Sequence, residues 1–317
     1  MYNNYKIILF GNIVWKNLSI SYDKRFINDF LFFSRNLIRN KLDYNNYIYF
    51  KSILSILRAE YIIYPVFSRE AFFDEFIFDL YSKYKISFYG NDVNHNKDLK
   101  FKYDKYYTTL INTNSMFEFY KYQDFFYYFL QSSNISKSTS IIKNLRKKEY
   151  IVISIGANSI KRTWNFSNFD KVIQFLLQHK FQIILLGSNN DLNLFSNYNS
   201  EIFNNKNLIN LIGKTTLKEF VDIISQAKLL ISNESSPVHV AVAVNTSFIC
   251  ISNANHYLRF CPYPSELCNF GRYLFPKNFN NTLSRHELYR KFEYGSELDI
   301  NSINSDDVIE EIIKILD

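Results

Sequence analysis

Residues 232–244 have the types and spacing of an anion-binding turn. An apolar run over residues 229–231 ends in hydroxyl and carboxylate side chains, and small apolar residues follow. Ser235 or Ser236 would cap the free amides of a helix, and Pro237 suits its first position. The amides and the positive end of the helix dipole would then face a ligand, for which phosphate is the common choice. A capped helix that binds nothing is the alternative.

Short aliphatic runs of the kind that a parallel sheet buries on both faces recur through the second half of the chain. They cover residues 151–155, 182–186, 208–212, 228–232 and 248–252. Helical patterns separate most of them. One is expected to start at the cap pair Ser167 and Asp170, and another at a capping box of Thr216 and Glu219. This alternation predicts an α/β, doubly wound sheet that binds ligands at the carboxyl ends of its strands.

The first half repeats the pattern less regularly. Strands are predicted over residues 5–10, 30–33, 61–66 and 85–89, and helices over residues 50–59, 71–80 and 117–130. The aromatic run at residues 124–130 is expected to form inter-helix core, with bilayer contact as the alternative. Residues 131–148 are rich in Ser, Asn and Lys and are predicted to be a linker.

Composition limits the classes of protein that fit. Hydrophobic residues make up 47% of the 317, so most of the chain should fold. The net charge of +7 suits anionic substrates or an anionic membrane face, but no clustered basic stripe favours nucleic acid. The three cysteines, Cys250, Cys261 and Cys268, lack metal-ligand spacing and fit a reducing compartment. Without a long apolar run or a signal-peptide core, we expect a cytoplasmic protein.

Four motifs in order resemble glycosyltransferase family 9, the lipopolysaccharide heptosyltransferase family. They are residues 155–157 with 161–164, residues 185–188, residues 211–217 and residues 232–239. Residues 259–264 resemble a further segment of one bacterial branch. The resemblance implies the GT-B fold, in which two Rossmann-like domains face each other across a cleft. The acceptor-side domain would span residues 1–135, and the donor-binding domain, with a C-terminal helix, residues 150–317.

The resemblance also assigns the donor site. In the family, the turn after the strand holds the donor's diphosphate, which here falls on Glu234, Ser235, Ser236, Pro237 and His239. Without the resemblance, His239 would be read as a packed or capping residue.

A basic residue before the tryptophan of the first motif binds donor phosphate in relatives. Lys161 and Arg162 both qualify, and a solvated basic pair is the alternative. Trp164 is expected to anchor packing rather than to contact a ligand. Ser188, Asn189 and Asp191 lie where relatives contact the ribose.

In the first half, Arg69 is the candidate for holding an anionic acceptor, because a guanidinium grips phosphate bidentately. A structural ion pair is the alternative. Asp74 and Glu75 follow it but are expected to be surface helix residues, so the catalytic base stays unassigned.

The start of the chain departs from the family pattern. Family members begin with an aliphatic strand and a Gly-Asp turn, whose Asp acts as general base, whereas residues 5–15 resemble the family's second strand. We therefore expect the N-terminal domain to be incomplete, with a gap in its sheet, and transfer activity to be low.

The function implied is that of a glycosyltransferase of heptosyltransferase type. It would transfer a sugar from a nucleotide-sugar donor to a lipopolysaccharide core or other glycolipid acceptor, in the cytoplasm and in peripheral contact with the anionic inner face of the membrane. No metal or other cofactor is implied, and nucleic acid is not expected as a partner. The alternative is a truncated, catalytically silent relative that only binds a nucleotide sugar or a partner. The sugar, nucleotide, acceptor and oligomeric state stay open.

Overall fold

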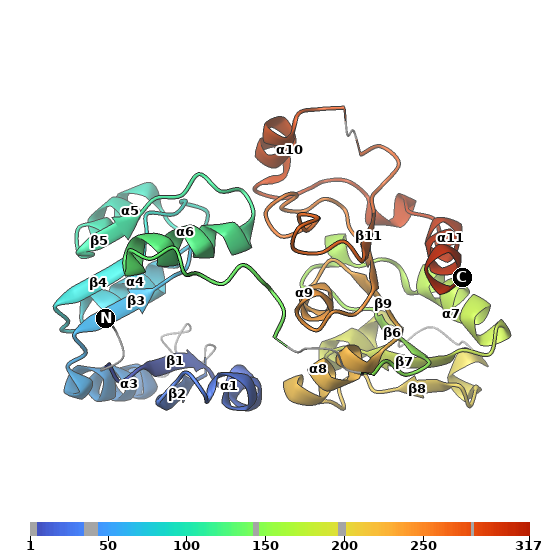
Figure 1. Ribbon diagram of the computed structural model, residues 1–317, viewed down its shortest axis with the longest axis horizontal. Coiled ribbons are helices and arrows are strands. Elements are labelled where there is room, and N and C mark those ends of the chain that lie inside the picture. Colours follow the sequence, from blue (N-terminus) through green and yellow to red (C-terminus); the bar gives the residue numbers. More distant parts are fainter. Residues whose placement is uncertain (1–4, 35–43, 142–145, 196–200, 280–281) are drawn as a thin grey trace. The chain divides into compact units, whose positions relative to one another are not determined.

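The structure, a computed structural model, describes residues 5–34, 44–141, 146–195, 201–279 and 282–317. The chain forms two compact units, Met1–Ser136 and Lys137–Asp317, which we call unit 1 and unit 2 (Figure 1). Each unit is built on parallel strands with helices between them.

Unit 2 contains a six-stranded sheet in the order β11-β10-β9-β6-β7-β8, and every neighbouring pair is parallel. The strands are β6 (Tyr150–Ser154), β7 (Gln182–Leu186), β8 (Leu208–Asn210), β9 (Leu229–Asn233), β10 (Phe248–Ile251) and β11 (Gly271–Leu274). The predicted parallel sheet is confirmed. The chain runs from β6 outward to β8 and then returns to the other side of β6, so the topology switches between β6 and β9.

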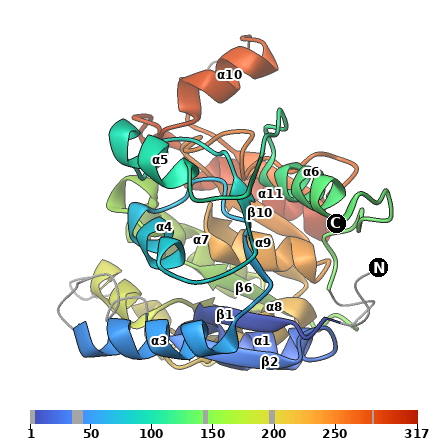
Figure 2. The same ribbon diagram turned by 90° about the vertical axis from the view of Figure 1, so that its left-hand side faces the viewer.

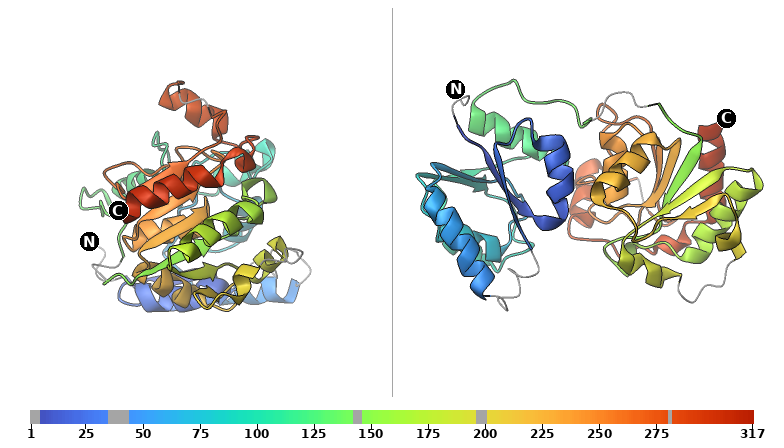
Figure 3. Two further views of the ribbon diagram at one scale, coloured as in Figure 1. Left: turned by 90° about the vertical axis from the view of Figure 1, so that its right-hand side faces the viewer. Right: turned by 90° about the horizontal axis from the view of Figure 1, so that it is seen from below.

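Helices cover both faces of this sheet (Figure 3). Two of them, α7 and α11, pack against each other on one face, and α8 and α9 do so on the other. The α-helices of unit 2 are α7 (Phe166–Gln178), α8 (Leu217–Gln226), α9 (Ser236–Ala243), α10 (Arg285–Phe292) and α11 (Ser305–Leu316). Short 3₁₀ turns are η2 (Ile160–Arg162), η3 (Asn189–Leu194), η4 (Glu201–Asn204) and η5 (Ile300–Ser302).

The core of unit 2 follows from its aliphatic runs. Every residue of β6, β9 and β10 is buried, as expected for strands covered on both faces. Trp164 is 1% exposed, its ring lies 5.0 Å from that of Phe169, and its Nε1 donates to the carbonyl of Ile303 at 3.0 Å. Its predicted role as a packing anchor is confirmed.

The two predicted helix starts have different outcomes. The capping box of Thr216 and Glu219 is present at the start of α8 and is confirmed. The Ser167 and Asp170 pair does not cap α7, because that helix already begins at Phe166 with Asn165 as its N-cap residue. The carboxylate of Asp170 instead accepts a hydrogen bond from Gln174, one turn further on.

Unit 1 holds two parallel sheets among its described residues, one of order β1-β2 and one of order β3-β4-β5. The strands are β1 (Ile8–Asn12), β2 (Asp29–Phe33), β3 (Tyr61–Tyr64), β4 (Tyr84–Phe88) and β5 (Thr109–Ile111). The helices are η1 (Ile13–Trp15), α1 (Lys16–Asp23), α3 (Tyr44–Leu57), α4 (Ala71–Phe78), α5 (Lys97–Asp104) and α6 (Glu118–Leu130). Figure 2 shows α4 and α5 on one side of strands β3 to β5 and α6 on the other.

Aromatic side chains make up much of the core of unit 1. Phe125 of α6 is fully buried against Phe88 of β4, with ring centroids 4.8 Å apart. Phe10 of β1 stacks on Phe76 of α4 at 5.8 Å. The α6 aromatics on its inner face do form core, but they pack against strands β4 and β5 rather than between helices as predicted, while Tyr127 and Tyr128 are exposed.

In the described parts of the chain, the helices are all too short or too polar to cross a membrane.

Candidate functional site

Unit 2 gathers polar residues at the carboxyl ends of β6 and β9, on either side of the topological switch. Such a point is where doubly wound sheets bind ligands. Gly156 follows β6, and Glu234 and Ser235 follow β9. The hydroxyl of Ser235 donates to the carbonyl oxygen of Gly156 at 3.2 Å, so the two loops touch across the switch.

Glu234 is a buried carboxylate with two polar partners. It is 3% exposed, accepts a hydrogen bond from the hydroxyl of Ser252, and lies 3.8 Å from Nη2 of Arg162. Burial raises the pKa of Glu234 to about 7, although the Ser252 hydrogen bond and the charge of Arg162 both act to lower it. The carboxyl group is therefore poised between its two protonation states near neutral pH.

The two basic residues of the loop after β6 differ in environment. Arg162 is half-buried, and its Nη2 donates to the carbonyl oxygen of Glu234 at 2.5 Å. Its buried Nε has no hydrogen-bond partner among the described residues. Lys161 is exposed and pairs with Glu297 at 2.7 Å on the surface, where ion pairs contribute little.

The predicted turn from a strand into a helix is present between β9 and α9, but its cap differs from the expected one. Ser235 is the N-cap residue of α9, yet its side chain makes no capping hydrogen bond, because its hydroxyl points to Gly156. The helix begins at the exposed Ser236, so Pro237 is its second residue rather than its first. The expected cap by Ser235 is therefore wrong in detail, while both serine hydroxyls lie at the positive end of the helix.

His239 lies in the first turns of α9, and its Nδ1 is 2.8 Å from the hydroxyl of Tyr263. Burial, and secondarily the charge of Arg162, lowers the pKa of His239 to about 4. The imidazole is therefore neutral at pH 7. It can donate or accept a hydrogen bond there but brings no positive charge to an anion, and its predicted contact with the donor's phosphate stays a prediction.

Two glycines leave room for an acidic side chain at the same edge. A Cβ atom on Gly156 would lie 2.3 Å from the carboxylate of Asp191, and one on Gly187 would lie 2.9 Å from it. Asp191 also accepts hydrogen bonds from the main-chain amide and the hydroxyl of Ser188, at 2.6 and 2.9 Å. These bonds belong to a capping box at the start of η3. The segment suggested for the ribose thus lies against the loop after β6.

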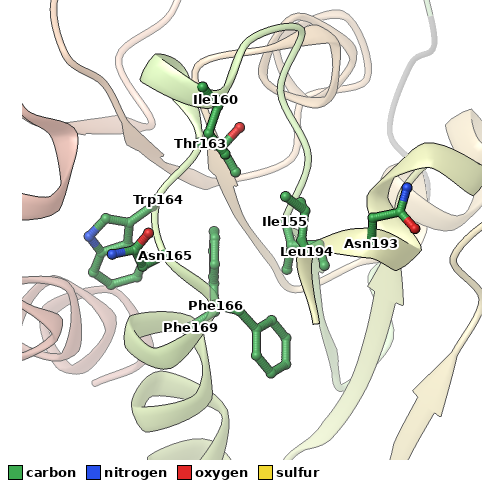
Figure 4. Close-up of a pocket in the computed structure, with 9 residues that line it drawn as sticks. All are labelled: Ile155, Ile160, Thr163, Trp164, Asn165, Phe166, Phe169, Asn193 and Leu194. Atoms are coloured by element: carbon green, nitrogen blue, oxygen red, sulfur yellow. The ribbon is translucent and has the colours of Figure 1, made fainter. Parts of the chain in front are cut away.

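A cavity of about 220 Å³ lies beneath the loop that carries Lys161 and Arg162 (Figure 4). Aliphatic and aromatic side chains form much of its wall, with Thr163 and two asparagines as polar members. The lining residues are Ile155, Ile160, Thr163, Trp164, Asn165, Phe166, Phe169, Asn193 and Leu194.

In unit 1, Arg69 belongs to the segment that connects β3 to α4, and its side chain is fully buried. It pairs with Asp104, lies 3.5 Å from Asp74, and its guanidinium carbon is 4.9 Å from the centre of the Tyr107 ring. These contacts are those of the structural ion pair that the sequence left open. A role for Arg69 toward an acceptor stays a prediction.

Asp74 is not a surface residue, contrary to expectation. It is 2% exposed, accepts a hydrogen bond from Tyr107 at 2.6 Å, and lies 3.0 Å from Nε2 of His95. Burial raises the pKa of Asp74 and lowers that of His95. The expectation failed because the helix α4 turns this face toward α5 and not toward solvent. Glu75, the next residue, is partly exposed.

Sequence reasoning missed three residues of the unit 2 site: Ser252, Asn253 and Tyr263. Ser252 and Asn253 are buried polar residues that directly follow the apolar strand β10. Since the carboxyl ends of parallel strands meet at one edge, that position was the available signal. Tyr263 lies 24 residues beyond His239, and no local pattern links the two.

The sequence and fold of this chain are similar to those of known proteins. A model of glycosyltransferase family 9 (heptosyltransferase) matches residues 78–280. Lipopolysaccharide heptosyltransferase 3 of Escherichia coli K12 is 30% identical over 172 residues, which are 54% of this chain and 47% of that protein. Lipopolysaccharide core heptosyltransferase OpsX of Haemophilus influenzae is 24% identical over 148 residues, which are 47% of this chain and 39% of that protein. The chain spans about half the length, or less, of these curated relatives.

Solved structures extend the likeness of fold over nearly the whole chain. The Escherichia coli heptosyltransferase WaaC with ADP has a TM-score of 0.70 at 10% identity, covering 99% of this chain and 91% of that one. A family 9 glycosyltransferase of Veillonella parvula has a TM-score of 0.70 at 12% identity, covering 98% and 88%. At such identities the likeness establishes the fold, and both units share it.

Proposed function

The chain belongs to glycosyltransferase family 9, and from that premise we propose that it transfers a heptose-type sugar from a nucleoside diphosphate donor to a lipopolysaccharide core or related glycolipid. The reaction would take place in the cytoplasm. The two curated relatives described above are lipopolysaccharide heptosyltransferases, and the solved heptosyltransferase WaaC holds ADP. An adenosine diphosphate sugar is therefore the first donor to test.

One observation carries the proposal: a buried guanidinium N–H without a protein partner lies at the switch point beside a helix N-terminus. Arg162 Nε is that group among the described residues of unit 2. The other end of the guanidinium is fixed on the carbonyl oxygen of Glu234, directly before α9. A diphosphate oxygen would supply the missing acceptor, and charged hydrogen bonds of this kind are the strong ones.

The same groups suit the chemistry of transfer. As the sugar leaves, negative charge grows on the diphosphate. A fixed guanidinium, the exposed hydroxyl of Ser236 and the positive end of α9 would stabilise that charge. Glu234 opposes anion binding when it is ionised, because it then competes for Arg162. Its raised pKa limits that competition near neutral pH.

Calorimetry with ADP tests the donor site. We expect the wild-type chain to bind ADP and Arg162→Ala to bind it about 10- to 100-fold more weakly, the range for losing a charged hydrogen bond. Lys161→Ala should have a smaller effect, because Lys161 is exposed and paired with Glu297. The exposed Lys171 of α7 gives a matched control, since Lys171→Ala removes the same charge away from the site.

Two results would contradict the proposal. Absence of ADP binding at millimolar concentrations would remove the donor site altogether. Equal weakening by Lys171→Ala and Arg162→Ala would mean that net charge alone attracts the nucleotide. Transfer itself is measured as ADP release from ADP-heptose that depends on an added core-lipid acceptor.

The proposal includes contact between unit 1 and an anionic membrane, where a glycolipid acceptor resides. The turn η1 and the end of α1 expose Val14 at 59%, Trp15 at 51% and Phe26 at 63%. Exposed cations, Lys16, Lys24 and Arg25, lie in the same segment. Apolar side chains flanked by basic ones are typical of surfaces that lie on bilayers, and each cation near an anionic surface adds about 1 kcal/mol.

Sedimentation with phosphatidylglycerol vesicles tests this contact. We expect the bound fraction to fall when Trp15 and Val14 are both replaced by Ser, and to fall with added salt. Tyr81→Ser is the matched control, because Tyr81 is 76% exposed elsewhere on unit 1. Equal binding to uncharged phosphatidylcholine vesicles, or equal loss with Tyr81→Ser, would contradict the assignment of this surface.

A further inference from the structure

The loop between β6 and α7, residues 155–165, carries both predicted phosphate-binding cations, yet main-chain bonds within it do not fix its position on the sheet. Its internal hydrogen bonds close only the η2 turn, from Arg162 and Thr163 back to Ser159 and Ile160. Two buried side chains at the ends of β9 and β10, Asn233 and Asn253, instead hold the loop by hydrogen bonds.

Asn233 ties together the two ends of the loop. It is the last residue of β9 and is 0% exposed. Its Nδ2 donates to the carbonyl oxygen of Ile155 at 2.8 Å, and its Oδ1 accepts from the amide of Trp164 at 3.0 Å. One planar amide thus bridges two partners that lie nine positions apart in the sequence.

Asn253 holds the middle of the loop. It lies two residues beyond β10 and is 2% exposed. Its Nδ2 donates to the carbonyl oxygen of Lys161 at 3.1 Å, while its Oδ1 accepts from the amide of Asn255 at 3.2 Å. Because β10 pairs with β9, with Ile251 opposite Asn233, the two asparagines extend from neighbouring strand ends.

The chemistry of the contacts requires an amide. Each of these side chains donates to a carbonyl oxygen and accepts from an N–H group at the same time, and the amide of Asn carries both functions on one short planar group. An aspartate would leave the loop carbonyl without a donor, and an aliphatic residue would leave both partners unsatisfied in a buried place.

From this geometry we propose that Asn233 and Asn253 are positioning residues for donor binding. They fix the main chain of the loop so that the guanidinium of Arg162 faces the start of α9, and they do so without contacting the donor. This inference rests on the proposed function, because it assigns the loop to the donor's diphosphate.

The main test compares Asn253→Ala with Thr246→Val. Thr246 is 0% exposed and donates to the carbonyl of Ile224 at 2.8 Å, before β10 and therefore at the opposite edge of the same sheet. Thr246 also accepts a hydrogen bond from Nζ of Lys147 at 2.6 Å, so each variant loses two hydrogen bonds, but only Asn253→Ala frees the loop. We expect Asn253→Ala to weaken ADP binding about tenfold, the factor that corresponds to one lost hydrogen bond, and Thr246→Val to leave the affinity within about twofold.

A combined variant separates positioning from general damage. If Asn253 acts through Arg162, adding Asn253→Ala to Arg162→Ala should weaken ADP binding little further, because the group being positioned is already gone. Fully additive losses would overturn the proposal, as would wild-type affinity in Asn253→Ala or an equal loss in Thr246→Val.

Hydrogen exchange gives a readout that needs no ligand. Asn253→Ala and Asn233→Asp should each accelerate amide exchange over residues 156–163, while Thr246→Val should not. If the wild type fails to bind ADP but the loop still loses protection, the proposed donor site is wrong and the fastening role stands. Unchanged exchange over the loop would overturn the inference, whatever the nucleotide does.

Discussion

Both units contain buried polar clusters, and the two clusters are satisfied in different ways. In unit 2, Asn233, Ser252 and Asn253 are buried and hydrogen-bonded. In unit 1, the cluster consists mainly of charged groups, with Arg69 contacting both Asp74 and Asp104. Among the described residues, eight of nine buried side-chain polar atoms without a hydrogen-bond partner lie in unit 1, on Ser68, Arg69, Asp74, Asn91 and His95.

The difference shows two ways of holding loops over a parallel sheet. Neutral amides with both functions paired give a site that is rigid before any ligand arrives, which is what electrostatic stabilisation requires. A buried cluster of charges depends on each member to neutralise the others, so removing one member leaves an uncompensated charge. The asparagines of unit 2 are thus satisfied within the protein itself, whereas the integrity of the unit 1 cluster depends on its charge balance.

The strands of the two units also differ in how deeply their residues are buried. All residues of β6, β9 and β10 are buried, whereas β1 and β3 consist mostly of half-buried residues, and Ile63 of β3 is 38% exposed. Burial of apolar surface is the dominant favourable contribution to folding. We therefore expect unit 2 to be the more stable half.

The largest effect is expected from breaking the charge balance of unit 1. Asp74→Ala leaves the fully buried Arg69 with Asp104 alone and removes the acceptor of the Tyr107 hydroxyl. We expect the free energy of unfolding of unit 1 to fall by about 3 to 5 kcal/mol. Urea unfolding followed by hydrogen exchange in each unit measures this loss.

A double variant is the control for that prediction. Replacing Arg69 by Met and Asp74 by Leu removes both charges and should recover much of the stability, since apolar pairs of similar volume often replace buried ion pairs without loss. If Asp74→Ala unfolds at the same urea concentration as the wild type, the charge cluster does not hold unit 1 together.

A smaller effect is expected from shortening one strand side chain in each unit, and its size should differ between the two units. Ile153 in β6 is 0% exposed, and Ile153→Ala should lower the free energy of unfolding of unit 2 by about 3 to 4 kcal/mol. Ile63→Ala in β3 should cost unit 1 less than about 1 kcal/mol, because much of that side chain already faces water. Similar shifts of the two urea midpoints would remove the distinction between the sheets.

The smallest effect concerns pH, because two opposing titrations meet in unit 2. The folded pKa of Glu234 is about 7 rather than 4.5, so the free energy of unfolding falls as the pH rises through that range. The folded pKa of His239 is about 4 rather than 6.5, so the free energy of unfolding falls as the pH is lowered through that range. Each effect is worth at most about 3 kcal/mol, and they offset each other where the ranges overlap.

Single variants expose each effect. In Glu234→Gln only the histidine remains, and the free energy of unfolding of unit 2 should rise between pH 4 and 6.5. In His239→Gln only the carboxyl group of Glu234 remains, and the free energy of unfolding of unit 2 should fall between pH 4.5 and 7. Thermal unfolding across this range measures both slopes, and identical profiles for the two variants would rule out the assignment.

Sequence reasoning worked where the signal is local. The aliphatic runs of β6, β7, β9 and β10 and the capping box at Thr216 involve residues at most a few positions apart, and the α/β fold follows from their alternation. In unit 1, β5, α1 and α5 were not predicted, because their short segments carry weak apolar periodicity.

The candidate site was predictable only in part. The turn after β9 could be placed from its residue types, but the roles of its members toward a donor stay predictions. The fastening of the loop could not be predicted, because Asn233 and Trp164 are 69 positions apart and Asn253 and Lys161 are 92 positions apart. Likewise, the burial of Asp74 depends on how α4 packs against α5 and not on its own sequence.

The hydrogen bonds that the two asparagines make to the loop go to main-chain atoms, and this has a consequence for how such a protein can diversify. A hold on carbonyl and amide groups is indifferent to the side chains that those residues carry. The exposed positions between the fastened points, Asn158 to Ile160, can therefore change identity while the loop keeps its path. The fold thus separates a constant anchor from a variable surface, as an antibody framework does for its loops, and gives directed evolution a short stretch that can vary without loss of the loop's path.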